Sequence, residues 1–182
     1  MSLPLFRRSD GQAPKEPEPA RPQALAPGIL SPDDLRAVMG VELKKARRYG
    51  YPVTGIMIEV DDPESAAEIA PEDLASDVAE ILQRNLRESD VLGRTDGGRF
   101  VCLLPYSIKQ GARIAAERLR RTFEVRHFLK TSAVAAVTIS VGIAQYDEIE
   151  FTGENDLLKA AAPALERARR AGGNRVVVHH VR

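Results

Sequence analysis

The sequence predicts an α/β domain in which helices flank a central sheet. Segments with apolar residues at helical spacing alternate with short, almost continuously apolar segments that are typical of buried strands. The length of 182 residues, 43% of them hydrophobic, suffices for one domain with a substantial core. Residues 1–29 contain many prolines among mixed charges and few large apolar side chains, so we expect a disordered tail followed by a domain at 30–182.

The composition excludes several classes of partner. Lysine plus arginine equals aspartate plus glutamate at 26 each, so no net charge attracts nucleic acid or an anionic membrane surface. No apolar run approaches the roughly 20 residues that span a bilayer. The one cysteine, Cys102, lies in an apolar segment, which excludes an internal disulfide and fits a reducing compartment. We therefore expect a cytoplasmic protein whose partner is recognised by a local site.

The first two elements have clear boundaries. Ser31 is expected to cap a helix that has Pro32 in its first turn, and Gly50 is expected to end this helix. Residues 53–60 are nearly continuous in apolar character, as in a strand covered on both faces. This strand delivers Glu59 and Asp61, which lie two residues apart and therefore on one face.

The centre of the chain predicts a β-hairpin between helices. A helix with apolar residues between 74 and 86 leads to a short strand, a tight turn at Asp96, Gly97 and Gly98, and an apolar strand from Phe100 to Leu104. Asp96 and Arg99 flank the two glycines, which let backbone amides approach a ligand closely. Such a tip suits a phosphate group.

The C-terminal part predicts three further elements and one irregularity. We expect a helix over 110–123, a long strand over 133–144, a last helix pattern after residue 157, and a final strand over 175–178. Pro163 lies inside the last helix pattern. Because an interior proline costs a helix about 3 kcal/mol, we expect a break or a kink there.

Several of these residues resemble the GGDEF domain, the fold of diguanylate cyclases, over about residues 35–178. The resemblance rests on Arg87, Asp90 and Arg94 before the turn, on Phe100 and Pro105 after it, and on the run TISVGIA at 138–144. It implies a mixed sheet of about five strands flanked by helices, similar to the palm of nucleotidyl cyclases. The five places of the family signature hold Asp96, Gly97, Gly98, Arg99 and Phe100.

The substituted signature predicts a protein that is not an enzyme. In the family, Mg²⁺ is held by carboxylates from the first strand and from the third signature place, and these are Glu59 and Gly98 here. We expect Arg99 to pair with Glu59 or Asp61 in place of the metal, so no metal or cofactor is expected. Glu72 stands where a guanine-binding carboxylate lies in the family, and Arg169 keeps one charge for a triphosphate. These four positions form the remnant of a cleft: Glu59, Asp61, Glu72 and Arg169.

The resemblance also implies a site for cyclic di-GMP. Arg87 and Asp90 hold the Arg-x-x-Asp spacing of the family's inhibitory site, and Arg118 matches a further arginine there. Arginine gives two hydrogen bonds to a phosphate or a guanine edge, and aspartate accepts from guanine N1 and N2. The same residues also suit ordinary structural roles, since a cation is favoured at a helix C-terminus and Asp90 can accept from backbone amides.

These observations predict a degenerate GGDEF protein of a bacterial signalling system that binds cyclic di-GMP and acts through an unidentified protein partner. Two alternatives stay open. One is a nucleotide-free protein interaction module, and the other is a vestigial GTP-binding regulator. A homodimer is also left open.

Overall fold

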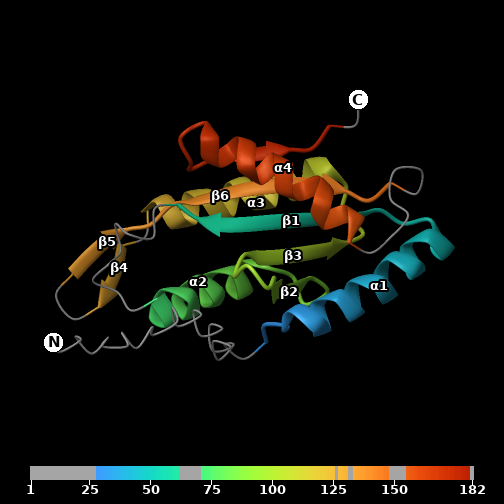
Figure 1. The fold of residues 1–182 in the computed structure, drawn as a ribbon, viewed down its shortest axis with the longest axis horizontal. Helices are drawn as coiled ribbons and strands as arrows, with labels where there is room; N and C mark the ends of the chain where they lie inside the picture. The colour runs from blue at the N-terminus through green and yellow to red at the C-terminus, as the bar shows by residue number, and fades with distance from the viewer. Residues whose placement is uncertain (1–27, 62–70, 126, 131–132, 148–154, 181–182) are drawn as a thin grey trace, which may run out of the picture.

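The structure, a computed structural model, describes residues 28–61, 71–125, 127–130, 133–147 and 155–180. Its centre is a five-stranded sheet with the strand order β2-β3-β1-β6-β7, in which only the β6–β7 pair is parallel (Figure 1). The strands are β1 (Val53–Val60), β2 (Val91–Arg94), β3 (Phe100–Pro105), β6 (Ile139–Gln145) and β7 (Val176–Val178). The mixed five-stranded sheet with flanking helices confirms the predicted fold class.

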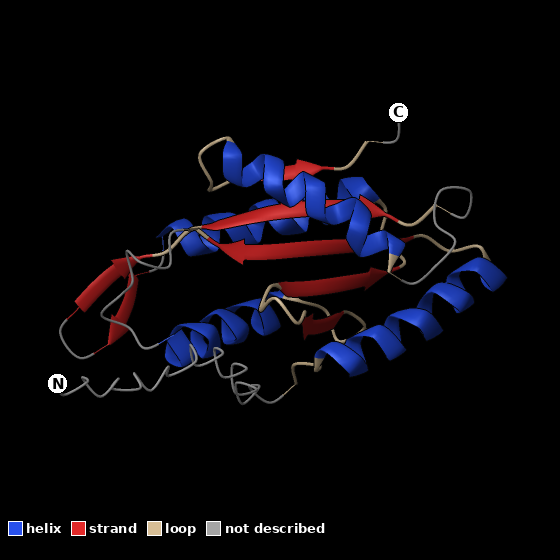
Figure 2. Cartoon of the chain, in the orientation of Figure 1, coloured by secondary structure: helices blue, strands red, loops and turns tan. Residues whose placement is uncertain are grey.

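Two pairs of helices cover the two faces of this sheet (Figure 2). The helices are α1 (Pro32–Tyr49), α2 (Pro71–Asn85), α3 (Lys109–Val125) and α4 (Asp156–Arg170). Helices α2 and α3 pack on the face that carries Ile56 and Ile58, whereas α1 and α4 pack on the face that carries Met57. Side chains of a strand point alternately to its two faces, so β1 is buried on both sides, as its apolar sequence predicts.

Helix α1 begins and ends as predicted. The Ser31 hydroxyl accepts a hydrogen bond from the backbone amide of Asp34 at 3.2 Å, and Pro32 occupies the first turn, where its missing amide hydrogen is not needed. Gly50 ends the helix at a φ of +68°, a left-handed conformation that favours glycine. Residues 1–27, most of the predicted tail, lie outside the described residues, whereas Ile29 is buried in the core and Leu30 bridges to Gly93.

The long strand predicted over 133–144 is wrong. The chain forms a separate two-stranded sheet from β4 (His127–Lys130) and β5 (Ala133–Ala136), and β6 begins only at Ile139. Thr138 lies between the two sheets, where its carbonyl accepts from the amide of Asp61 and its hydroxyl donates to the carboxylate of Asp61. The apolar sequence on either side of Thr138 gives no sign of this change of sheet.

Of the break or kink predicted at Pro163, the break is wrong, because α4 continues through this residue, and the kink stays a prediction. The helix buries one apolar face completely, including Leu157, Ala161 and Leu165, against the sheet. Most helical stability in proteins comes from such packing, which here offsets the proline. At Gly142 of β6, an added Cβ would lie 2.8 Å from the Cβ of Leu165. Helix α4 therefore lies directly on the backbone of β6.

Candidate functional site

The predicted hairpin is present, and hydrogen bonds close its turn. The register of β2 and β3 pairs Arg94 with Phe100, and the turn between them closes through Gly98 N donating to Thr95 O at 2.9 Å. Gly98 has a φ of +78°, which favours glycine at this place. The guanidinium of Arg94 donates twice to the carbonyl of Gly98 and lies 5.0 Å above the ring of Phe100. The next residue, Arg99, is thereby held at the start of β3.

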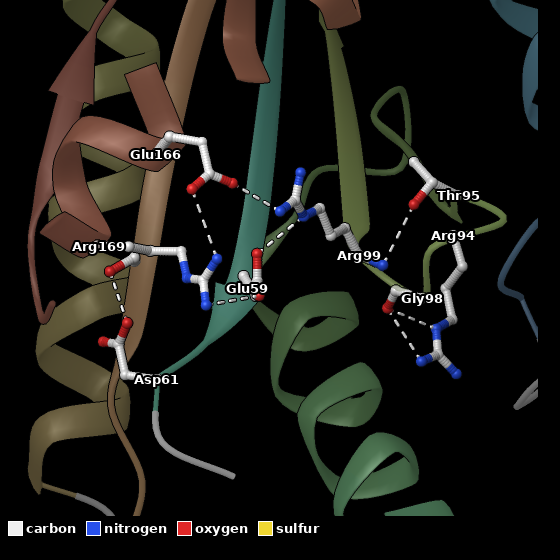
Figure 3. Close-up of polar contacts among 9 residues, drawn as sticks. Glu59, Asp61, Arg94, Thr95, Gly98, Arg99, Glu166 and Arg169 are labelled. Carbon is white, nitrogen blue, oxygen red and sulfur yellow. Dashed lines mark hydrogen bonds and ion pairs between the residues drawn. The ribbon is translucent and has the colours of Figure 1, made fainter. Parts of the chain in front are cut away.

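Arg99 is the centre of an ion-pair cluster that consists of Glu59, Arg99, Glu166 and Arg169 (Figure 3). Its Nε atom lies 2.8 Å from Glu59 Oε2, and its Nη2 atom lies 2.7 Å from Glu166 Oε1. Arg169 adds longer contacts of 3.4 Å to Glu59 and 3.6 Å to Glu166. The expected ion pair of Arg99 is therefore present, with Glu59 as its partner from β1. Glu166 was not among the predicted site residues.

Asp61 has a different set of partners. Its carboxylate accepts hydrogen bonds from Ser140 Oγ at 2.6 Å, Thr138 Oγ1 at 2.9 Å and the backbone amide of Asn174 at 2.7 Å. A Cβ added at Gly173 would lie 2.9 Å from Asp61 Cγ, so the loop before β7 passes very close to this carboxylate. Through these hydrogen bonds, Asp61 connects the end of β1 to β6 and to the loop that precedes β7.

These carboxylates do not fit a divalent metal ion in the arrangement described. Both oxygens of Glu59 face arginine nitrogens, and both oxygens of Asp61 accept hydrogen bonds. A hard cation needs several free oxygen ligands and is repelled by nearby guanidinium groups. In the part of the chain that the structure describes, no group of three or more His, Cys, Asp or Glu side chains is placed to hold a metal. Glu72 is the second residue of α2, and its side chain lies outside the described residues.

The three residues predicted to bind cyclic di-GMP are brought together between α2 and α3. Asp90 Oδ2 accepts from the backbone amide of Arg87 at 2.8 Å, and the amide of Asp90 donates to the carbonyl of Arg87 at 3.0 Å. Arg118 of α3 donates from Nη2 to the carbonyl of Asn85, the last residue of α2, at 2.8 Å. The structural roles expected for Asp90 and for a cation at the end of α2 are therefore present, the latter filled by Arg118.

A groove of about 760 Å³ lies on the outer side of α3, and the described residues that line it all belong to this helix. Arg118 lines the groove together with two arginines that the sequence did not single out, Arg113 and Arg121. Ile114 and Val125, each 73% exposed, add apolar surface. The spacing of these residues along α3 was visible in the sequence, but only the structure shows that this side of the helix remains uncovered among the described residues.

The family of the chain follows from a match over residues 68–175, more than half of its length, to the family described as "Diguanylate cyclase, GGDEF domain". The chain belongs to the GGDEF family. Its relatives include diguanylate cyclase DgcP of Pseudomonas aeruginosa, which is 35% identical over 101 residues, or 56% of this chain and 15% of the relative. The probable diguanylate cyclase DgcC of Escherichia coli is 28% identical over 155 residues, or 83% of this chain and 41% of the relative. The GGDEF chain thus spans less than half the length of these relatives.

Solved GGDEF structures share the fold. The GGDEF domain of DgcB from Caulobacter crescentus, in complex with c-di-GMP, superimposes with a TM-score of 0.76 at 18% identity and covers 83% of this chain and 91% of its own. The active GGEEF domain of a diguanylate cyclase from Vibrio cholerae superimposes with a TM-score of 0.76 at 20% identity and covers 85% and 99%. At these identities the likeness establishes the fold.

These comparisons contradict the prediction that the GGDEF chain is not an enzyme, because the matched family is that of diguanylate cyclases and the relatives are named as such. That prediction rested on Gly98 at the third signature place and on the cation of Arg99 beside Glu59 and Asp61. The structure has both of these carboxylates at the end of β1 (Figure 3). None of the helices in the described ranges is both long and apolar enough to cross a membrane.

Proposed function

We propose that this GGDEF domain binds cyclic di-GMP at the surface formed by Arg87, Asp90 and Arg118. The observation that carries the proposal is the bond from Arg118 to the last carbonyl of α2, because it brings an arginine of α3 next to the Arg87–Asp90 turn. The DgcB domain that shares the fold was solved in complex with c-di-GMP, which supports the same ligand class here.

The three side chains match the chemistry of a cyclic dinucleotide. Arg87 and Arg118 are exposed and carry charges that suit the ligand's two phosphates or the O6 and N7 atoms of guanine. One oxygen of Asp90 already accepts from Arg87, while the other, Oδ1, is shielded from solvent and has no hydrogen-bond partner among the described residues. An unpaired buried acceptor costs about 1–3 kcal/mol. A guanine donor that reached this oxygen after a rotation of the side chain would remove that cost.

The groove on α3 extends the surface beyond the three residues. Arg113 and Arg121 add positive charge within the same groove as Arg118, and Ile114 adds an apolar patch on which a base could stack. Ligand sites commonly combine apolar lining with a few converging polar groups. The described lining holds three arginines and one glutamate, Glu117, so its net positive charge suits an anionic ligand.

Isothermal calorimetry with cyclic di-GMP tests the proposal. Losing one charge-assisted hydrogen bond removes about 1.5–3 kcal/mol, so Arg87→Ala, Asp90→Ala and Arg118→Ala should each weaken binding roughly tenfold or more. Arg84→Ala is the matched control, since Arg84 lies on α2 close before the turn and pairs with Glu80. No heat from a folded wild-type protein would overturn the proposal in favour of a nucleotide-free interaction module. Heat with GTP alone would favour a GTP-binding regulator.

The second candidate is the reaction for which the relatives are named, the synthesis of cyclic di-GMP. The acidic groups available for it are Glu59 and Asp61 at the end of β1, and both would have to exchange their present partners for Mg²⁺. Incubation with GTP and Mg²⁺, followed by chromatography, tests this candidate directly. Product that the wild type forms and the Glu59→Gln variant does not would support this candidate. If folded wild-type protein forms no product over a wide range of Mg²⁺ concentrations, the candidate is excluded.

A further inference from the structure

The cluster of Glu59, Arg99, Glu166 and Arg169 balances its own charge. Two carboxylates face two guanidinium groups, and the four side chains are between 25% and 42% exposed. Charges in such a half-buried place interact more strongly than charges in water, so an unbalanced carboxylate would be costly. The ion pairs therefore stabilise the charged forms of the two half-buried glutamates, Glu59 and Glu166.

Arg99 makes the closest contacts of the cluster, and it bridges two elements that are far apart in the sequence. Its Nε atom bonds Glu59 of β1 and its Nη2 atom bonds Glu166 of α4, at 2.8 and 2.7 Å (Figure 3). A divalent cation shared by two carboxylates would make the same kind of bridge. Arg169 contributes less, because its contacts are longer and it is the most exposed member at 42%.

The backbone fixes the position of this guanidinium. Arg99 directly follows the Gly98 turn, and its own amide donates to Thr95 Oγ1 at 3.2 Å. Its carbonyl accepts from the amide of Thr95 at 2.9 Å. We propose that Arg99 is the built-in cation of this cluster: its guanidinium occupies the position between Glu59 and Glu166 that a divalent ion could otherwise take.

The proposal predicts that removing the charge of Arg99 creates a divalent-cation site. Two half-buried carboxylates would then face one another with only the more exposed Arg169 to neutralise them. A divalent ion would gain both carboxylates as oxygen ligands and would no longer be repelled by Arg99. The inference is independent of cyclic di-GMP binding, since it involves none of Arg87, Asp90 and Arg118.

Binding of Mn²⁺, measured by the electron paramagnetic resonance of the free ion, tests the proposal. We expect Arg99→Gln to bind Mn²⁺ at least about tenfold more tightly than the wild type, and Arg99→Lys, which keeps a cation, to show no such gain. The double variant Arg99→Gln with Glu166→Gln should lose the gain. Arg36→Gln is the matched control, because Arg36 also bridges two carboxylates, Asp33 and Asp96, but these are 91% and 78% exposed.

Two results would overturn the proposal. One is a folded Arg99→Gln protein with no gain in Mn²⁺ binding, and the other is a gain that persists in the double variant. Thermal unfolding gives a second measurement should Arg99→Gln be unstable. Mn²⁺ should then raise the melting temperature of Arg99→Gln and leave that of the wild type unchanged, and an equal response of the two proteins would contradict the proposal.

Discussion

The contact between β6 and α4 gives the sharpest quantitative prediction, at Gly142. A Cβ added there would lie 2.8 Å from the Cβ of Leu165 and closer still to the carbonyl oxygen of Ala161 and the amide nitrogen of Leu165. Carbon atoms in contact normally stay about 3.5–4.0 Å apart, so Gly142→Ala requires helix and strand to separate by roughly 1 Å. Two of the three atoms belong to the backbone of α4, so a side-chain rotation cannot relieve the clash.

The cost follows from the packing of α4. Overpacking a core typically costs about 1–3 kcal/mol. We expect the upper part of this range, about 3 kcal/mol, because the apolar face of α4 is completely buried and moves as a unit. For a domain of this size, that loss lowers the melting temperature by about 6–12 °C. The displacement would also draw Glu166 away from Arg99, which adds to the loss.

Urea unfolding followed by circular dichroism measures this effect. Gly111→Ala is the matched control, because Gly111 lies in α3 and no heavy atom approaches its added Cβ within 4 Å. Alanine favours a helix over glycine, so the control should gain about 0.5–1 kcal/mol. A Gly142→Ala protein whose unfolding free energy stays within about 0.5 kcal/mol of the wild type would refute the close approach of α4 to β6.

Three further predictions concern single side chains. Pro163→Ala should raise the unfolding free energy by about 1–3 kcal/mol in urea titrations, because it restores a backbone hydrogen-bond donor inside α4. An unfolding free energy below that of the wild type would show that the packing of α4 depends on the proline. Ser31→Ala should lower it by about 1 kcal/mol through the lost N-cap, whereas Ser31→Asn should leave it nearly unchanged. Burial raises the pKa of the Cys102 thiol from 9.0 to about 12, so the unfolded chain ionises first and stability falls as the pH rises through this window. The wild type should lose up to about 1.4 kcal/mol per pH unit there, and Cys102→Ala should show a smaller slope.

Local signals in the sequence were sufficient for much of the fold. The start of α1 follows from a serine cap before a proline, and the β2–β3 hairpin follows from two glycines between apolar segments. Both signals act over a few residues, which is the range that sequence patterns report. The spacing of Arg87 and Asp90 is a local signal of the same kind, and in the structure the two residues bond to each other within one turn.

Features that depend on long-range contacts could not be read from the sequence. Glu166 meets Arg99 across 67 positions, and nothing near either residue indicates the pairing. Thr138, which lies between the two sheets, bonds to Asp61, 77 positions away. Pro163 stays within a helix because the sheet beneath α4 stabilises it, which a local proline rule omits.

The two candidate sites lie on the same β2–β3 unit, so it matters whether they influence each other. The Arg87–Asp90 turn precedes β2, Arg99 begins β3, and the two strands pair in one fixed register. Coupling between sites requires an element with two arrangements that both sites bias. The structure shows one arrangement of the turn, closed by hydrogen bonds at Gly98, and the partners of Arg99 differ from those of Arg118. Arg99→Gln should therefore change the affinity for cyclic di-GMP by less than about twofold in calorimetry, well below the roughly tenfold loss expected for Arg87→Ala. A loss in Arg99→Gln as large as that in Arg87→Ala would show instead that the hairpin moves as a switch between the two sites.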